Sequence, residues 1–425
     1  MSRQLAQRVE QLWSSHLRDP VETLRESRLL LESDAAGPGE RAWIDLTLGY
    51  HHLLRRAPRE AAPSLDRALH AFLALGEHRA EMLARTGIAR TLIAQGRAGE
   101  ARDTLLAIYP AAMEQLDARE RFWVLDALGS ACLYTDGIDD AFRHFHDALG
   151  TLRSIEHSPQ LPMVMSNLAA TLVMMGEYVP ARELAQDALG LLPHYDHPEV
   201  TLAAQSHLAE ALLGTGDMQA ALTLVAAMRE DPQVLAMSSP QNQHCAVIAE
   251  VHARAGMVAI AHEAADCAVR IAADHDAGFN GVHARWAVAV VAEASGDDAA
   301  ALAAFTDALD AAQAAGHLAI TCKAAEHAAG HAAALLEFAD AYNLQCIAHR
   351  AMERRLASRA QAREHVLRSE HEQERAQWLR DHAERQEQEA AAVDRQLHQM
   401  HEELEAKRAR LAELEAGLAA SPSSG

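Results

Sequence analysis

The sequence predicts an all-α protein in which repeated helical hairpins are followed by one long helix. Three observations predict this fold. First, 49% of the 425 residues are hydrophobic but only 4% are aromatic, so small aliphatic side chains must form the core, and the abundant alanine favours helices. Second, 22 glycines and 13 prolines are too few for a turn-rich β-sandwich or propeller. Third, residues 48–329 repeat with a period of 40.

The repeat is carried by columns of small and aliphatic residues. A large aliphatic residue is followed at once by Gly or Ala, as at Leu128 and Gly129. Small residues at such positions let neighbouring helices approach closely, so we expect the columns to pack and to bind nothing. A column of alanines without exception follows later in each unit: Ala61, Ala101, Ala141, Ala181, Ala221, Ala261, Ala301 and Ala341.

Each unit divides into two helix-length segments separated by a short break that carries a glycine. Glycine suits the left-handed backbone that ends a helix. An acidic residue often follows, as in Gly176-Glu177, and the positive end of the next helix stabilises it. The pattern therefore predicts helix–turn–helix units. The break glycines are Gly96, Gly137, Gly176, Gly216, Gly256 and Gly296.

These columns resemble the tetratricopeptide repeat (TPR), whose 34-residue pattern has a large-then-small pair in the first helix and alanines in the second. The match includes Leu128-Gly129, Ala141, Phe145 and Ala148. Six further residues per unit make it similar to the 40-residue variety of large bacterial sensor and regulator proteins. The resemblance implies an α-solenoid of about nine helical hairpins, with residues 40–349 as the solenoid and 1–39 as a capping hairpin.

Residues 350–418 are expected to form a coiled coil, and 419–425 a disordered tail. The seam has apolar residues at alternating spacings of four and three, with one polar position, a device that often fixes the register of a coiled coil. It predicts a homodimer; the alternative is a solvated, partly frayed single helix. The seam residues are Val393, Leu397, Met400, Leu404, Lys407, Leu411, Leu414 and Leu418.

In the TPR family the first helix of each repeat lines a concave groove, and this resemblance implies where a partner would bind. Aromatic and arginine side chains commonly dominate interfaces, which favours Trp123, Tyr134, Arg254 and Trp286 as anchors. About half of the groove positions are equally well read as packing residues. The groove positions are Arg90, Trp123, Asp126, Ser130, Tyr134, Ser166, Ser206, Glu210, Glu250, Arg254, His283 and Trp286.

Motifs that carry chemistry are missing from the sequence. It contains no phosphate-binding Gly-Lys-[Ser/Thr], no Gly-x-Ser-x-Gly and no His-Glu-x-x-His, so we expect no enzyme and no cofactor. His327 and His331 have the spacing of a helical metal-binding pair, with Glu326 beside them. Because no further ligand is identifiable, no metal site is predicted, and whether this pair binds a metal is left open.

Charge and cysteine usage narrow the partners and the compartment. The formal net charge is −22, which disfavours nucleic acid as a partner. Five widely spaced cysteines without a C-x-x-C motif are typical of a reducing compartment. Neither a signal peptide nor an apolar stretch that could span a membrane is recognisable, so we expect a cytoplasmic protein without membrane contact.

Together these features predict a non-enzymatic interaction scaffold or sensory module. It would bind a peptide or protein in the concave groove and dimerise through the coil. An alternative comes from the architecture as a whole, because a 40-residue repeat array followed by a charged coil resembles the sensory half of bacterial diguanylate cyclases. In that case the chain would be an input module without its catalytic domain.

Overall fold

The computed structural model describes residues 2–32, 36–135, 137–152, 155, 157–195, 197–230, 242–274 and 278–419. All regular elements in these ranges are helices, which confirms the predicted all-α fold class. The chain divides into two compact units, Met1–Ala362 and Arg363–Gly425. The helix α19 (Phe338–Ala419) belongs to both, because its first 25 residues lie in the first unit.

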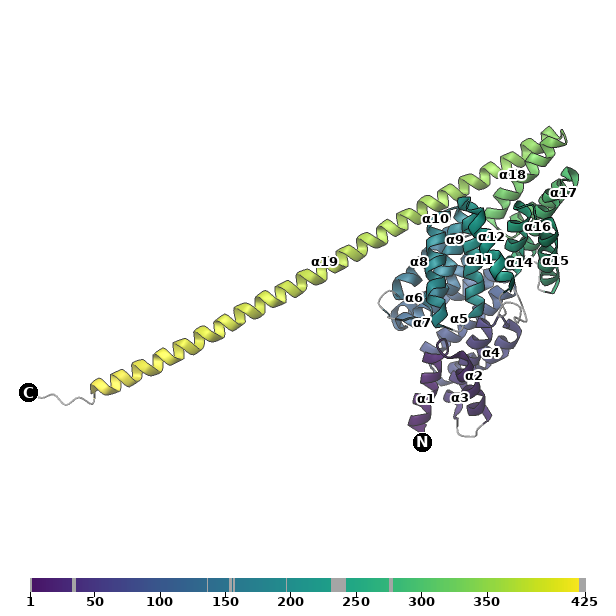
Figure 1. Cartoon of the computed structure of the whole chain (residues 1–425). Coiled ribbons are helices and arrows are strands. Elements are labelled where there is room, and N and C mark those ends of the chain that lie inside the picture. Colours follow the sequence, from purple (N-terminus) through teal and green to yellow (C-terminus); the bar gives the residue numbers. More distant parts are fainter. Residues whose placement is uncertain are drawn as a thin grey trace, which may run out of the picture. The chain divides into compact units, whose positions relative to one another are not determined.

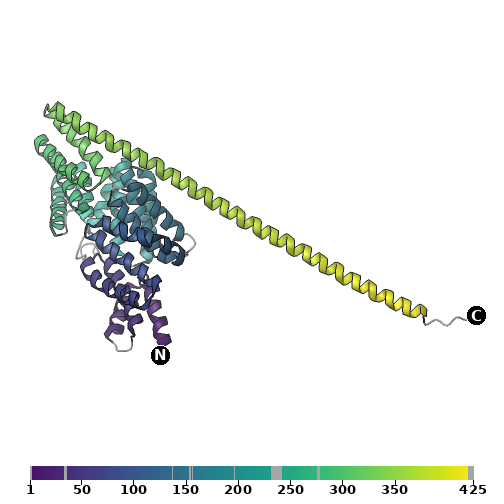
Figure 2. The same ribbon diagram turned by 180° about the vertical axis from the view of Figure 1, so that it is seen from behind.

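Over the described ranges the first unit is a succession of nine helical hairpins, which Figures 1 and 2 show from opposite sides. Each inner helix runs into its outer partner through a short turn, as expected for a TPR-like solenoid. The hairpins are α1 (Ser2–Ser15) with α2 (Pro20–Glu32), α3 (Pro38–Leu54) with α4 (Pro58–Leu75), α5 (His78–Ala94) with α6 (Ala98–Gln115), α7 (Ala118–Leu133) with α8 (Ile138–Leu152), α9 (Leu161–Met175) with α10 (Tyr178–Leu191) and the 3-10 turn η1 (Leu192–His194), α11 (Pro198–Thr215) with α12 (Met218–Glu230), α14 (Asn242–Arg254) with α15 (Val258–Asp274), α16 (Gly278–Ala294) with α17 (Asp298–Ala314), and α18 (Leu318–Ala334) with the start of α19.

The small-residue columns pack between the helices. All seven alanines of the invariant column from Ala61 to Ala301 are fully buried. Gly129 on α7 shows why the neighbouring column must be small, since a Cβ atom added there would lie 2.7 Å from the ring of Phe145 on α8. Phe145 is itself 1% exposed and cannot move aside without disturbing the core.

The turn column contains an exception that the sequence pattern does not reveal. Five break glycines, from Gly96 to Gly296, adopt the left-handed backbone with φ between 76° and 81°. Gly137 does not adopt a positive φ, so its prediction as a left-handed cap is wrong. In the same column two residues with side chains take this conformation, Arg56 with φ 53° and Leu336 with φ 65°.

Contacts between residues far apart in sequence close the solenoid upon itself. Arg55 at the end of α3 pairs with Glu199 on α11 at 3.4 Å, and Arg18 after α1 donates to the backbone oxygen of His157 at 3.3 Å. Helix α18 contacts α9. These residues are separated by about three to five repeats of 40 residues, so successive superhelical turns touch each other.

Arg355 in the first-unit part of α19 makes the longest of these connections. Its Nε donates to the backbone oxygen of Met174 at 2.9 Å, at the end of α9. The next turn of α19 adds an ion pair between Arg359 and Glu177 at 2.6 Å. A guanidinium at a helix C-terminus satisfies carbonyl groups that lack an intrahelical partner and interacts favourably with the helix dipole.

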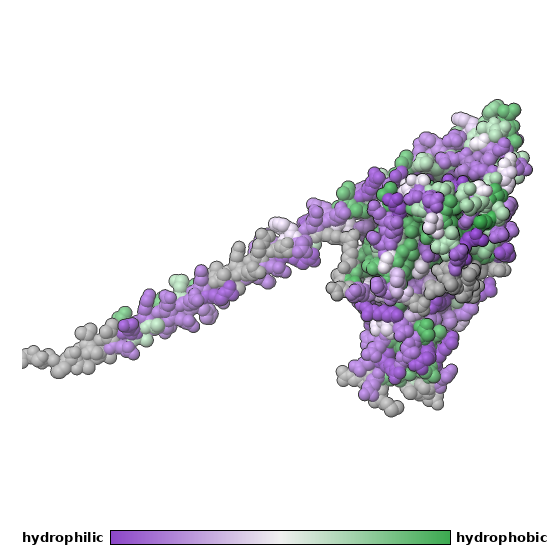
Figure 3. Space-filling view, in the orientation of Figure 1, coloured by the Kyte–Doolittle hydropathy of each residue, from purple (hydrophilic) through white to green (hydrophobic). Residues whose placement is uncertain are grey.

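The second unit, from Arg363 on, is described as one continuous helix as far as Ala419. Its described seam residues are exposed: Leu397 58%, Met400 63%, Leu404 50% and Leu411 58%. Figure 3 shows a few hydrophobic residues along a helix whose coloured part is mostly hydrophilic. The side chains of Val393, Leu414 and Leu418 and the proposed tail beyond Ala419 lie outside the described residues. The coiled coil therefore stays a prediction.

A span of apolar residues sufficient to cross a lipid bilayer does not occur in any helix of the described ranges.

Candidate functional site

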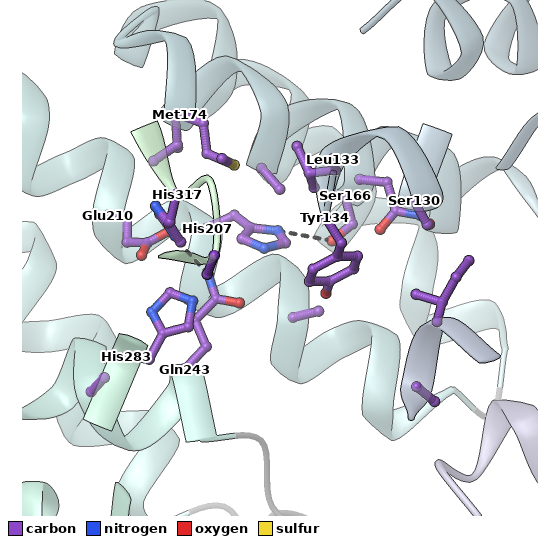
Figure 4. Close-up of a pocket in the computed structure, with 18 of the residues that line it drawn as sticks. Ser130, Leu133, Tyr134, Ser166, Met174, His207, Glu210, Gln243, His283 and His317 are labelled. Atoms are coloured by element: carbon purple, nitrogen blue, oxygen red, sulfur yellow. Dashed lines mark hydrogen bonds between the residues drawn. The ribbon is translucent and has the colours of Figure 1, made fainter. Parts of the chain in front are cut away.

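The first unit contains a partly open cavity of about 590 Å³. Most of its wall is made by the first helix of a hairpin, namely α3, α5, α7, α9, α11, α14, α16 and α18, and the turns and second helices supply the rest. Polar side chains from several of these helices converge on the same space, as Figure 4 shows for His207, Glu210, Gln243 and His283. The size lies within the range typical of ligand pockets.

The sequence explains why the first helices form the inner layer. Helix α9 buries eleven side chains spread around its circumference, from Pro162 to Met175. Helix α10, its outer partner, buries only Ala181, Ala185 and Ala188, which share one face. A helix that is apolar on most sides must be covered by neighbours, whereas one with a single apolar stripe faces water on its other side.

Arg56 is the most unusual residue of the cavity wall. It occupies the turn between α3 and α4 with φ 53°, where five other repeats have glycine. A left-handed backbone costs a residue with a Cβ atom roughly 1–2 kcal/mol. The side chain is exposed to the cavity, but the surrounding helices exclude enough water to lower the pKa of Arg56, partly offset by Tyr134 and Glu199. Within the described residues its guanidinium has no hydrogen-bond or ion-pair partner.

Arg90, by contrast, is fully engaged. Its guanidinium pairs with the carboxylate of Asp126 on α7 and lies 5.1 Å from the ring centroid of Trp123. Asp126 is fully buried and also accepts a hydrogen bond of 2.6 Å from the side-chain amide of Asn167 on α9. This network links three successive inner helices, so much of it serves the fold.

Glu210 on α11 is a half-buried carboxyl group facing the cavity. The side-chain amide of Gln243 on α14 donates to it at 3.2 Å. Burial raises the pKa of Glu210 to about 7, helped by the charge of Glu250 and opposed by Lys323 and the Gln243 amide. The group therefore changes between neutral and charged near neutral pH, inside the candidate site.

A second acidic centre surrounds Glu250 on α14. The indole nitrogen of Trp286 donates to its carboxylate at 2.7 Å, and Arg254 pairs with it at 2.8 Å. Lys323 from α18 approaches to 3.6 Å. Burial acts to raise the pKa of Glu250, but Lys323, Arg254 and the Trp286 hydrogen bond outweigh it, and the net pKa is lowered. Glu250 is thus a buried anion with its charge compensated.

Three buried histidines contribute polarity without charge. Burial lowers the pKa of His207 and of His283 to about 4, and that of His317 well below its usual value. At neutral pH each ring therefore offers one donor and one acceptor nitrogen. His207 lies 3.2 Å from the hydroxyl of Ser166, and the rings of His283 and His317 are 5.2 Å apart.

The twelve predicted groove residues separate into two sets. Eight line the cavity: Arg90, Ser130, Tyr134, Ser166, Glu210, Glu250, His283 and Trp286. The other four do not line it: Trp123, Asp126 and Ser206 are buried behind the wall, and Arg254 is exposed and pairs with Glu250. Among the proposed anchors, Trp123 is 2% exposed within an aromatic cluster with Tyr50 and Phe122.

Several wall residues were not anticipated from the sequence. They are Arg56, Glu199, His207, Gln243, His317 and Lys323. For Arg56 a signal exists in the sequence, because an arginine interrupts a column that otherwise favours glycine. The remaining positions carry no comparable signal, since their place on the wall depends on how the hairpins wind.

The pair His327 and His331 is accompanied by two carboxylates from the preceding hairpin. His327 Nδ1 lies 2.7 Å from the Glu293 carboxylate, and His331 approaches both Glu293 at 3.2 Å and Asp298 at 2.8 Å. Both rings also stack on Phe305. These are imidazole–carboxylate hydrogen bonds that join α18 to α16 and α17. The absence of a metal here stays a prediction.

Comparison with known proteins identifies the fold but no family. The sequence matches no described protein family and no curated protein. A Rap protein complexed with Competence and Sporulation Factor is 13% identical, with a TM-score of 0.61 over 84% of this chain and 99% of that one. NprR in complex with its cognate peptide NprX is 12% identical, with a TM-score of 0.54 over 83% and 99%. At these identities the likeness is one of fold, and it confirms the TPR-like helical repeat.

Proposed function

We propose that this protein is a peptide-binding regulatory module whose cavity takes a short peptide, with an acidic group of the peptide at Arg56. The observation that carries the proposal is the guanidinium of Arg56, which has no hydrogen-bond or ion-pair partner among the described residues and lines a partly open cavity of about 590 Å³. An arginine presents a planar set of donors that matches a carboxylate, and a free peptide C-terminus is such a group.

The rest of the wall is suited to a peptide. The carboxyl group of Glu210, which faces the cavity, favours an amine or a basic side chain when it is ionised. Neutral histidines and the amide of Gln243 can exchange hydrogen bonds with peptide groups. The two solved structures of the same fold hold the Competence and Sporulation Factor and the peptide NprX, which supports the same mode here.

A catalytic role is less well supported. Ser166 and His207 form the hydroxyl–imidazole pair found in hydrolases. Ser166 is only 1% exposed, however, and the described residues place no carboxylate in hydrogen-bond contact with His207. A nearly buried hydroxyl and an imidazole without an orienting carboxylate among the described residues favour binding over turnover.

Arg56→Gly tests the proposal by separating folding from binding. Glycine relieves the left-handed strain, so the unliganded variant should melt at a higher temperature than the wild type. The same change removes the anchor. The probe is a pool of random hexapeptides with free C-termini, compared with the same pool carrying C-terminal amides, and the readout is the thermal shift at fixed peptide concentration.

We expect the free-acid pool to stabilise the wild type and to leave Arg56→Gly nearly unshifted. Arg97→Gln is the matched control, because Arg97 sits in the next turn but pairs with Glu100 and does not line the cavity. Equal shifts of wild type and Arg56→Gly would contradict the role of Arg56. No shift with any pool would contradict peptide binding itself.

Dimerisation through α19 is part of the same proposal. The exposed apolar residues Leu397, Met400, Leu404 and Leu411 support it, since a second helix would remove them from water. The alternative of a diguanylate-cyclase input module draws on the resemblance of the repeat array and the following charged helix to the sensory half of such proteins. Copurification of the chain with a cyclase that its presence activates would favour that alternative, and a cyclase indifferent to it would count against it.

A further inference from the structure

The cysteines Cys245 and Cys267 lie together although 21 residues separate them in sequence. Cys245 is in the first turn of α14 and 6% exposed, and Cys267 is in the last half of α15 and half-buried. Their sulfur atoms are 2.9 Å apart. The distance is shorter than the separation of two sulfur atoms in ordinary contact, and the side chains already point at each other as a disulfide requires.

We infer that Cys245 and Cys267 form a dithiol site that hydrogen peroxide oxidises to an intramolecular disulfide. The bond would join the two helices of one hairpin. This inference is independent of the proposed peptide function, since it involves the contact between α14 and α15 and no ligand of the cavity.

The surroundings assign different roles to the two thiols. A hydrogen bond from Cys245 and the charge of Arg270 on the same helix lower the pKa of Cys267. Cys245 has its pKa raised, first by its hydrogen bond to Cys267 and then by burial. Cys267, the more exposed of the two, is thus the attacking thiolate, and Cys245 is the resolving thiol.

The reaction balances with the peroxide as the only oxidant. The Cys267 thiolate attacks one peroxide oxygen, the O–O bond breaks, and hydroxide leaves and takes up a proton to become water. Cys267 is then a sulfenic acid. The Cys245 sulfur attacks the Cys267 sulfur, the S–S bond forms, the S–O bond breaks, and the oxygen leaves as a second water after taking up the thiol proton. Two thiols lose two electrons, and the peroxide gains them.

The remaining cysteines provide internal controls. Cys132 and Cys322 are buried, and burial raises the pKa of each thiol, so both should react slowly. Cys346 is half-buried and lies on α19. Formation of the disulfide would affect the cavity near Cys245, because Gln243 and Ala246, on either side of this cysteine, belong to the cavity wall.

The test treats the reduced full-length protein with hydrogen peroxide and counts free thiols, then locates the linkage by peptide mapping. We expect the count to fall from the five free cysteines to three, with Cys245 and Cys267 in one cross-linked peptide that dithiothreitol releases. Cys346→Ser should behave as the wild type. In Cys245→Ser, dimedone should trap Cys267 as a sulfenic acid, and no disulfide should form.

Failure is visible in the wild type alone, so the outcome does not depend on the folding of a variant. Absence of the Cys245–Cys267 linkage after peroxide treatment overturns the inference, as does a linkage of Cys267 to another cysteine or to a second chain. Loss of the same two thiol equivalents in Cys267→Ser would also overturn it.

Discussion

Apolar side chains are buried in the repeats but exposed along the helix beyond Arg363. In the repeats the invariant alanines from Ala61 to Ala301 are fully buried within the same chain. Along the second unit the seam residues from Leu397 to Leu411 are half or more exposed. Both regions have a regular hydrophobic period, 40 residues in one case and seven in the other. The difference is whether one chain supplies both surfaces of the contact.

This contrast explains what each region needs. A solenoid repeat covers its neighbours on both sides, so its stability is intramolecular and independent of protein concentration. An isolated helix with an exposed apolar seam lacks such cover and gains stability from a second helix. The repeats should therefore tolerate changes in the seam, and the seam should be indifferent to changes in the repeats.

The largest effect is expected from placing charge in the seam. Leu397→Glu combined with Leu404→Glu should abolish self-association, because burying two carboxylates per chain in an apolar contact costs roughly 5 kcal/mol or more. Sedimentation equilibrium at micromolar concentration should show the mass of a dimer for the wild type and of a monomer for the variant.

The control adds the same charge beside the seam. Gln399→Glu combined with Ala406→Glu should leave the dimer intact, since these positions lie outside the alternating four-and-three spacing. A wild type that sediments as a monomer would contradict the dimer, and dissociation by both double variants would point to net charge instead of a seam.

Arg355→Ala tests whether the repeats hold together across superhelical turns. The arginine is 6% exposed and donates to the end of α9, so its loss leaves the carbonyl of Met174 without that partner and should cost about 3 kcal/mol. Amide hydrogen exchange should accelerate around Gly176, and the urea midpoint should fall. Arg350→Ala is the control, because Arg350 is exposed and donates to the backbone oxygen of Cys346 in its own helix. Equal effects of both variants would contradict the connection.

Gly129→Ala tests the small-residue column. An added Cβ would lie 2.7 Å from Phe145, and overpacking of this kind costs about 1–3 kcal/mol. Gly330→Ala on α18 is the matched control, since no atom lies within 4 Å of its added Cβ and alanine stabilises a helix by about 0.5–1 kcal/mol. Opposite changes in melting temperature are expected; a stabilised Gly129→Ala would show that the column is not close-packed.

The local fold was predictable from sequence because the repeat reports it many times over. The alanine column that includes Ala101 and Ala141 recurs in eight units, and such a recurrence is very unlikely to arise by chance. The inner position of the first helices followed from the TPR resemblance, and Tyr134 and Glu210 do line the cavity. These features depend on neighbours within one period of the chain.

The remaining features of the site depend on how the hairpins wind around one another, and the 40-residue period of the sequence does not determine this winding. Trp123 was expected to be an anchor of the groove, but the winding places the guanidinium of Arg90 over its ring and the ring of Tyr50 in T-shaped contact with it. The contact of Arg355 with α9 joins residues about 180 positions apart, beyond any pattern a repeat can show. Arg56 is an intermediate case. The sequence shows that it interrupts the glycine column, but it does not show that Arg56 lies on the cavity wall.

The smallest expected effect concerns the charge of Glu210 in the cavity, compared with a charge on the exposed helix α19. Glu210 has a pKa of about 7 because burial disfavours its anion, against a usual value of 4.5. Between pH 4.5 and 7 the carboxyl group of Glu210 is protonated in the folded protein but ionised in the unfolded chain. The free energy of unfolding therefore falls as pH rises from about 4.5 to 7. Glu210→Gln removes this loss, so the variant should gain stability relative to the wild type at pH 8 compared with pH 5, by roughly 1–3 kcal/mol.

Glu403→Gln, on the exposed part of α19, should show no such difference. Parallel pH profiles of melting temperature for wild type and Glu210→Gln would mean that the cavity is as open to water as the helix beyond Arg363, and the distinction between the two regions would not extend to their charges.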